Sequence, residues 1–142
     1  MGTRSLTFVY DTNFSDRPKA LCCIYRQMDG YPRGMGKDLA DFAAKVTIVN
    51  GISLDGPEQI ANGGGCFAAQ LVAHLKTGPG GIYLHETGEK QDANQEYEYR
   101  LYVKAGEKVR MKVKGVYKKK TVFDDTVDKF DDFLAKSEEG LQ

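Results

Sequence analysis

Residues 23–40 read CIYRQMDGYPRGMGKDLA, and this stretch decides the fold. It begins in an apolar strand predicted over Leu21–Arg26, whose apolar residues on both faces indicate a place inside a sheet. A loop with three glycines and one proline follows, and such residues end regular structure. The loop opens directly into a helix that begins between Gly36 and Asp38, because apolar residues then recur at helical spacing. The chain is therefore expected to turn from a buried strand into a helix that covers the sheet.

Residues 62–76 read NGGGCFAAQLVAHLK, and a second helix is predicted to follow the three glycines at the start of this stretch. We expect this helix to run from about Cys66 to the end of that stretch. Phe67, Leu71 and Leu75 form its apolar stripe, and alanine and valine residues widen the stripe. A helix with so little polar surface is expected to be buried between layers.

Four further strands are predicted over Leu6–Tyr10, Ile82–Glu86, Glu96–Val103 and Lys108–Lys114. Apolar and polar residues alternate in all of them except Ile82–Glu86. The last two strands are joined by a short turn and are expected to form an antiparallel hairpin with one solvated face. Between these elements, Ile52–Gly65 is expected to be irregular.

An amphipathic helix is predicted near the end of the chain, with Asp124 and Asp125 at its N-terminus, where carboxylates interact favourably with the helix dipole. Its apolar residues are Val127, Phe130, Phe133 and Leu134. The order of elements predicts a single α+β domain over residues 1–142: a mainly antiparallel sheet of about five strands, with two central helices and a C-terminal helix packed on it. Residues 137–142 are predicted to form a frayed tail.

Composition bounds the setting of the protein. Twenty lysine and arginine residues balance twenty aspartate and glutamate residues, so no net field draws the chain towards nucleic acid or a membrane. Three cysteines are an odd number, and the neighbours Cys22 and Cys23 point to opposite faces of a strand, so a disulfide framework is not expected. No apolar run reaches the roughly 20 residues of a membrane span, and the N-terminus does not read as a signal peptide. We expect a cytoplasmic protein with neither a membrane nor a nucleic acid as partner.

The N-terminus of the first helix is a candidate anion site. Helix N-termini expose unpaired N–H groups and a partial positive charge, and glycine lets a ligand approach the backbone. Arg26, Arg33 and Lys37 would neutralise an anion, and Tyr25 or Tyr31 would stack on a ring.

The alternative interpretation is an ordinary connection between a strand and a helix. Asp29 and Gly30 would then form the turn, and Arg26 would pair with Asp29. The spacing of Gly34 and Gly36 does not complete a dinucleotide-binding fingerprint.

The second helix places Cys66 in its first turn, a position that favours the thiolate. His85 lies on the strand that follows, and a cysteine on a helix with a histidine on a neighbouring strand is the arrangement of cysteine hydrolases. A triad needs a third, orienting group, and the nearby candidates are Glu86, Gln70 and Asn62. In the structural interpretation Cys66 is a small buried residue.

No metal site or cofactor is predicted, since two histidines eleven residues apart, His74 and His85, and three cysteines match no zinc spacing. The run Lys112–Lys120 with Tyr117 either contacts a nucleic-acid backbone or forms a solvated strand face, and the zero net charge favours the solvated face.

Several motifs together resemble a known group of proteins. They are MGTRSL at residues 1–6, YRQMDGYP at 25–32 with Gly34 and Gly36, NGGGC at 62–66 continuing to Lys76, and GGIYL at 80–84. In these motifs the chain resembles a family of small uncharacterised proteins of bacteriophages and bacteria, over roughly residues 1–103. The resemblance implies a viral or bacterial setting and brings no residue roles with it. A phage setting would fit counter-defence, in which a small protein sequesters a nucleotide signal of the host.

We predict a non-catalytic binding protein whose pocket, between the two helix N-termini, holds an anionic, nucleotide-like small molecule. The predicted ligand-binding residues are Arg26, Asp29, Tyr31, Arg33, Gly34, Gly36, Lys37, Gly64, Gly65 and Cys66. One alternative is a cysteine hydrolase that uses Cys66 and His85. Another is a protein-interaction module that blocks a host factor through the tyrosine-bearing hairpin. A homo-oligomer is compatible with each of them.

Overall fold

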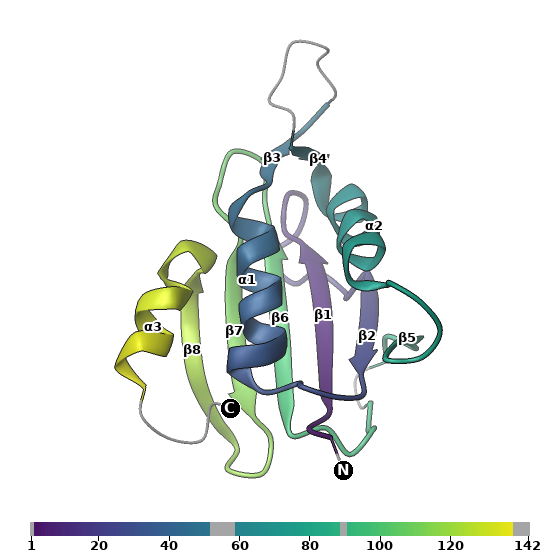
Figure 1. Cartoon of the computed structure of the whole chain (residues 1–142). Coiled ribbons are helices and arrows are strands. Elements are labelled where there is room, and N and C mark those ends of the chain that lie inside the picture. The colour runs from purple at the N-terminus through teal and green to yellow at the C-terminus, as the bar shows by residue number, and fades with distance from the viewer. Residues whose placement is uncertain (1, 52–58, 89–90, 138–142) are drawn as a thin grey trace.

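The computed structural model describes residues 2–51, 59–88 and 91–137, and in them a six-stranded sheet carries three α-helices on one face (Figure 1). The strands of this sheet are β1 (Ser5–Asp11), β2 (Cys22–Arg26), β5 (Ile82–His85), β6 (Tyr97–Val103), β7 (Arg110–Gly115) and β8 (Lys120–Thr126). A separate pair is formed by β3 (Thr47–Val49) and β4 (Ile60–Asn62). The helices are α1 (Lys37–Ala44), α2 (Gly63–Leu75) and α3 (Phe130–Lys136), with a π-helical turn (Pro32–Gly36) before α1 and a 3-10 turn (Val127–Lys129) before α3.

The order of strands across the sheet is β5-β2-β1-β6-β7-β8. β1 and β6 are parallel, and all other neighbours are antiparallel. The predicted α+β fold with a mainly antiparallel sheet is therefore confirmed. Because β1 pairs with β6, the N-terminal strand and the C-terminal hairpin form the middle of one sheet.

The sixth strand, β8, is the main difference from the predicted five. Asp124 and Asp125 lie within this strand, so their predicted place at the N-terminus of the last helix is wrong. Val113 and Lys114 of β7 pair with Phe123 and Thr121, so Val122 is an extra residue that breaks the alternation along β8. Aspartate is also uncommon in strands, so the sequence pattern does not show β8.

Two further boundaries differ from expectation. The stretch predicted to be irregular contains β4, whose Ile60 pairs with Thr47 of β3. Residues 52–58 lie outside the described part of the chain, as do residues 138–142 of the predicted tail. α2 begins at Gly63, because the carboxylate of Asp11 accepts a hydrogen bond from the backbone N–H of Gly64 at 2.8 Å and so caps the helix from a distant strand.

Among the described helices, none has the length and apolar character to cross a membrane.

The main core lies between the helices and the sheet. Its fully buried side chains come from both layers: Ile24, Met35, Leu39, Phe67, Leu71, Tyr99, Leu101, Met111, Val113 and Phe130. As predicted, the hairpin alternates, with Tyr99 and Leu101 buried here while Arg100 and Tyr102 face the other way.

We call the sheet face opposite the helices the back face. Its centre is covered as well, since Leu6, Phe8 and Cys23 form a second, smaller cluster packed against Ala20 and Ala93 from the connecting loops. Towards β6, β7 and β8 the back face carries charged side chains.

Candidate functional site

The cations of the first predicted site are bound to other parts of the protein. Nη1 of Arg26 lies 2.6 Å from Oδ2 of Asp38, and its Nε donates a hydrogen bond to the carbonyl of Met28 at 2.8 Å. Arg26 therefore ties the end of β2 to the first turn of α1. Its predicted partner, Asp29, instead accepts a hydrogen bond from the hydroxyl of Tyr31 at 3.0 Å, and this bond raises the pKa of Tyr31.

Arg33 and Lys37 hold the C-terminal helix in place. Nη2 of Arg33 donates to the carbonyl oxygens of Leu134 and Ser137 at 2.8 and 2.9 Å, where α3 ends. Nζ of Lys37 lies 3.0 Å from a carboxylate oxygen of Asp131 and 3.0 Å from one of Asp41. Hydrogen bonds to these two carboxylates raise the pKa of Lys37. Carboxylate or carbonyl groups of the protein therefore bind both cations, in place of the ligand predicted from the sequence.

The glycines of the predicted site allow close packing. A Cβ atom on Gly34 would collide with the carbonyl oxygen of Asp29, and one on Gly36 would lie 2.7 Å from the ring of Phe130. A Cβ atom on Gly64 would lie 2.5 Å from Cβ of Asp11. Gly65 is different, since nothing lies within 4 Å of an added Cβ atom there.

The two glycine-rich helix N-termini lie at opposite ends of the sheet. β3 follows α1 and pairs with β4, and β4 runs directly into α2, so the start of α2 lies beside the end of α1 (Figure 1). The structure does not bring Gly34 and Gly36 together with Gly64 and Gly65 into one pocket.

Cys66 and His85 are also apart. Cys66 is exposed on α2, which packs on the helix-bearing face of the sheet. His85 pairs with Cys23, whose side chain belongs to the back-face cluster, and its ring stacks on Tyr25 at 4.9 Å. The sheet therefore separates the two members of the predicted dyad.

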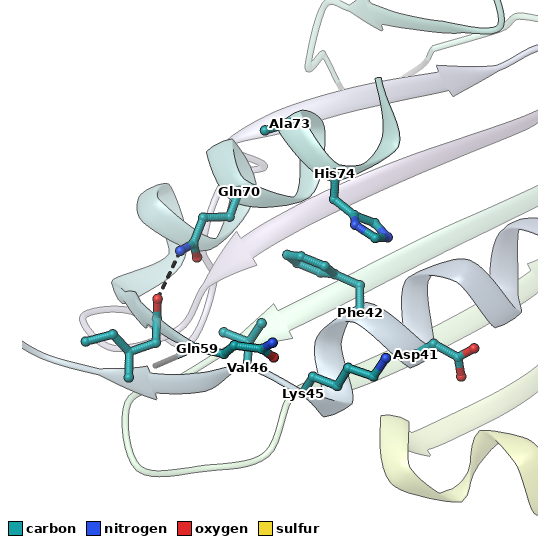
Figure 2. A pocket seen from close by; sticks show the side chains of 9 residues that line it. Asp41, Phe42, Lys45, Val46, Gln59, Gln70, Ala73 and His74 are labelled. Atoms are coloured by element: carbon teal, nitrogen blue, oxygen red, sulfur yellow. Dashed lines mark hydrogen bonds between the residues drawn. The ribbon is translucent and has the colours of Figure 1, made fainter. Parts of the chain in front are cut away.

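An open groove of about 480 Å³ lies between α1 and α2, beside β4 (Figure 2). It is lined by Asp41, Phe42, Lys45, Val46, Gln59, Ile60, Gln70, Ala73 and His74. The rings of Phe42 and His74 are part of this lining and stack on each other, with centroids 4.9 Å apart and planes inclined by 30° (Figure 2).

Polar groups surround this ring pair. Nε2 of Gln70 donates a hydrogen bond to the carbonyl of Ile60 at 2.9 Å, which fixes the amide at the rim (Figure 2). Lys45 and Gln59 are exposed, and Lys45 forms no ion pair with any described residue. Asp41, the carboxylate of the groove, is neutralised by Lys37.

A second hollow of about 470 Å³ shares His74 with this groove. It is lined by Arg26, Gln27, Met28, Asp29, Asp38, Leu75, Thr77, Gly81 and Ile82 as well. Arg26 and Asp29, both predicted as site residues, therefore lie near His74, while the cations Arg33 and Lys37 bind elsewhere.

The groove residues are not among those predicted from the sequence. A signal for them exists, since Phe42, Lys45 and Val46 occupy positions i, i+3 and i+4 of the chain, and Gln70, Ala73 and His74 repeat this spacing on α2. Residues with this spacing share one side of a helix. What the sequence does not reveal is that these two sides face each other.

Comparisons with protein families, with curated proteins and with solved structures find no match to this chain. Within residues 2–51, 59–88 and 91–137, no group of three or more His, Cys, Asp or Glu side chains is placed to hold a metal ion. The groove itself offers two rings, one lysine, two amides and one neutralised carboxylate, together with the apolar residues Val46, Ile60 and Ala73.

Proposed function

We propose that this protein is a non-catalytic binding protein, and that the groove between α1 and α2 holds an anionic molecule with a planar ring, such as a nucleotide. The observation that carries the proposal is the pair of rings, Phe42 and His74, at 4.9 Å in an open groove beside Lys45.

The ring pair supplies a stacking surface. Aromatic rings prefer offset or tilted stacking on other rings, and every nucleobase offers a π-face. Both rings line the groove, so a base lying against this pair would exchange water for aromatic surface.

The polar groups supply recognition of the remainder of the ligand. The ammonium group of Lys45 forms no ion pair with the described residues, so it is available to a phosphate or carboxylate. The amides of Gln59 and Gln70 offer donors and acceptors to the edge of a base, and the carbonyl oxygen of Gln70 remains as an acceptor once its nitrogen binds Ile60. These groove residues are not the cations, tyrosines and glycines that the sequence predicted to bind a ligand.

The proposal includes no catalysis, because Cys66 and His85 lie on opposite sides of the sheet. Sequestration of a host nucleotide signal by a phage protein stays a prediction, as does the cytoplasmic location.

The first test is thermal unfolding with a panel of linear nucleotides, cyclic nucleotides and other phosphorylated metabolites. A ligand present at about 100 times its Kd stabilises the fold by roughly 2.7 kcal/mol, which raises the melting temperature by several degrees. Phe42→Leu and Lys45→Gln should each raise the Kd of the compound found by about tenfold. Lys136→Gln, an equal change of charge on the exposed side of α3, should leave the Kd unchanged.

Two outcomes would contradict the proposal. One is that no compound raises the melting temperature. The other is that the shift survives both groove substitutions but is lost in the double variant Arg33→Ala and Lys37→Ala, which would place the site at the start of α1.

A further inference from the structure

The balanced composition hides a local row of cations on β7. Arg110, Lys112 and Lys114 alternate along the strand with Met111 and Val113, which are fully buried in the main core. The three cations therefore share the back face, and successive members are about 7 Å apart along the strand.

The neighbouring strands add one cation and two carboxylates to this part of the back face. Arg100 of β6 lies opposite Lys112 and forms an ion pair with Glu98 at 3.0 Å. Arg110 pairs with Asp124 of β8 at 3.2 Å, and about half of each side chain is exposed. Exposed pairs of this kind contribute little, so a phosphate group can compete with Asp124 for Arg110. Among the described residues, neither Lys112 nor Lys114 forms an ion pair, although Asp124 lies directly opposite Lys112.

A stacked pair of tyrosines lies beside the row. The rings of Tyr10 and Tyr102 are 5.2 Å apart and inclined by 15°, and both residues are half-buried. In front of Tyr102 lies a shallow hollow of about 400 Å³. Its lining includes four basic residues and two acidic ones: Lys104, Lys108, Arg110, Lys112, Glu107 and Asp124.

We propose that this part of the back face, made by β1, β6 and β7, binds single-stranded nucleic acid. Phosphates would lie along Arg110, Lys112 and Lys114, and a base would stack at Tyr102. Sequence-tolerant binding of single strands combines a basic track with aromatic rings, and this part of the sheet has both. A duplex keeps its bases stacked inside, so it could use the cations but not the ring. The surface is separate from the proposed groove, because the groove lies between α1 and α2. These helices cover the other face of the sheet (Figure 1).

The test is fluorescence anisotropy with labelled RNA and DNA of mixed sequence, single-stranded and duplex, about 12 nucleotides long. The protein should bind the single strands more tightly than the duplex. Each phosphate contact contributes about 0.7 to the slope of log K against log salt for single strands, so the double variant Lys112→Gln and Lys114→Gln should lower that slope by about 1.4. At low salt it should also bind at least about tenfold more weakly.

Two tyrosine variants separate stacking from folding. Tyr102→Leu should weaken binding of single strands at least about fivefold, because base stacking on aromatic rings is lost. Tyr102→Phe keeps the ring and should bind like the wild type. The melting temperature of each variant shows whether it is folded. Lys136→Gln on α3 removes one positive charge outside β7 and is the control for the loss of each lysine.

Three results would overturn the proposal. The first is that single strands do not bind at about 50 mM salt. The second is that Lys136→Gln weakens binding as much as the β7 double variant does. The third is equal binding of the duplex with no effect of Tyr102→Leu, which would identify a general surface for polyanions, including acidic proteins.

Discussion

At the scale of single residues, the close packing of α1 against the C-terminal part of the chain depends on a glycine that has no side chain. Gly36 leaves room for Phe130, a fully buried ring that meets Phe123 edge to face at 5.0 Å. Gly36→Ala would push its Cβ atom to 2.7 Å from this ring, so the variant should lower the free energy of unfolding by about 1–3 kcal/mol, as overpacked cores do. Urea unfolding measures the change.

Gly65 is the matched control for that substitution. It lies in α2 with open space around an added Cβ atom, so Gly65→Ala should raise the free energy of unfolding by about 0.4–1 kcal/mol through helix propensity and a less flexible unfolded chain. If Gly36→Ala and Gly65→Ala changed stability alike, close packing would not be the reason for Gly36.

At the scale of secondary-structure elements, Arg33 secures the short helix α3 from the other end of the chain. Its two hydrogen bonds to Leu134 and Ser137 satisfy carbonyl groups that a helix terminus leaves without partners. Arg33→Gln should destabilise the protein by about 1 kcal/mol and speed hydrogen exchange of the α3 amides, while ligand binding in the groove is retained. Arg33→Lys keeps the positive charge but lacks the several N–H donors of the guanidinium group. Its stability and its exchange rate in α3 should lie between those of the wild type and of Arg33→Gln.

The opposite result for Arg33→Gln would place the ligand site at the start of α1 and not in the groove. Unchanged exchange in α3 together with loss of nucleotide binding in Arg33→Gln would identify Arg33 as a ligand residue, as the sequence first suggested.

The elements differ in how far the sequence predicts them. β1, β6 and β7 follow from plain alternation, β2 and β5 follow from short apolar runs, and α1 follows from its apolar spacing. β8 does not, because its bulge and its two aspartates hide the pattern, and the start of α2 does not, because its capping carboxylate is Asp11 on β1. Local patterns predict local structure, whereas caps and edge pairings depend on residues distant in sequence.

The same limit applies to the candidate site. The density of polar groups around Arg26, Arg33 and Lys37 is real, but these side chains join β2, α1 and α3 to one another. A sequence shows that such groups are numerous, and only the fold shows which of them already have partners. The Phe42–His74 pair is the opposite case: no cluster in the sequence marks it, because it forms only where α1 and α2 meet in the fold.

At the scale of the whole molecule, the inner strands β2 and β6 of the sheet place ionisable groups in the protein interior. Tyr99 is fully buried between β1 and β7, and its hydroxyl donates a hydrogen bond to the carbonyl of Gly30 at 2.6 Å. Burial raises its pKa well above the ordinary value of 10.0. On the back face, burial raises the pKa of Cys23 from 9.0 to about 11. Both groups are therefore neutral in the folded protein at pH values where the unfolded chain would ionise them.

This linkage predicts loss of stability in alkali. Where the folded pKa is the higher one, the folded protein retains the proton that the unfolded chain releases, so the free energy of unfolding falls as pH rises through the interval. The interval begins near pH 9 for Cys23 and near pH 10 for Tyr99, and each group contributes a slope of up to about 1.4 kcal/mol per pH unit.

Urea unfolding at a series of pH values measures this slope. Cys23→Ala should make it shallower between pH 9 and 11, and Tyr99→Phe should do so above pH 10. Each variant also loses stability at neutral pH, so the slope is the deciding quantity. Tyr117→Phe, at a residue that is 72% exposed, is the control. An identical slope in the wild type and both core variants would show that these buried groups do not set the alkaline limit of the fold.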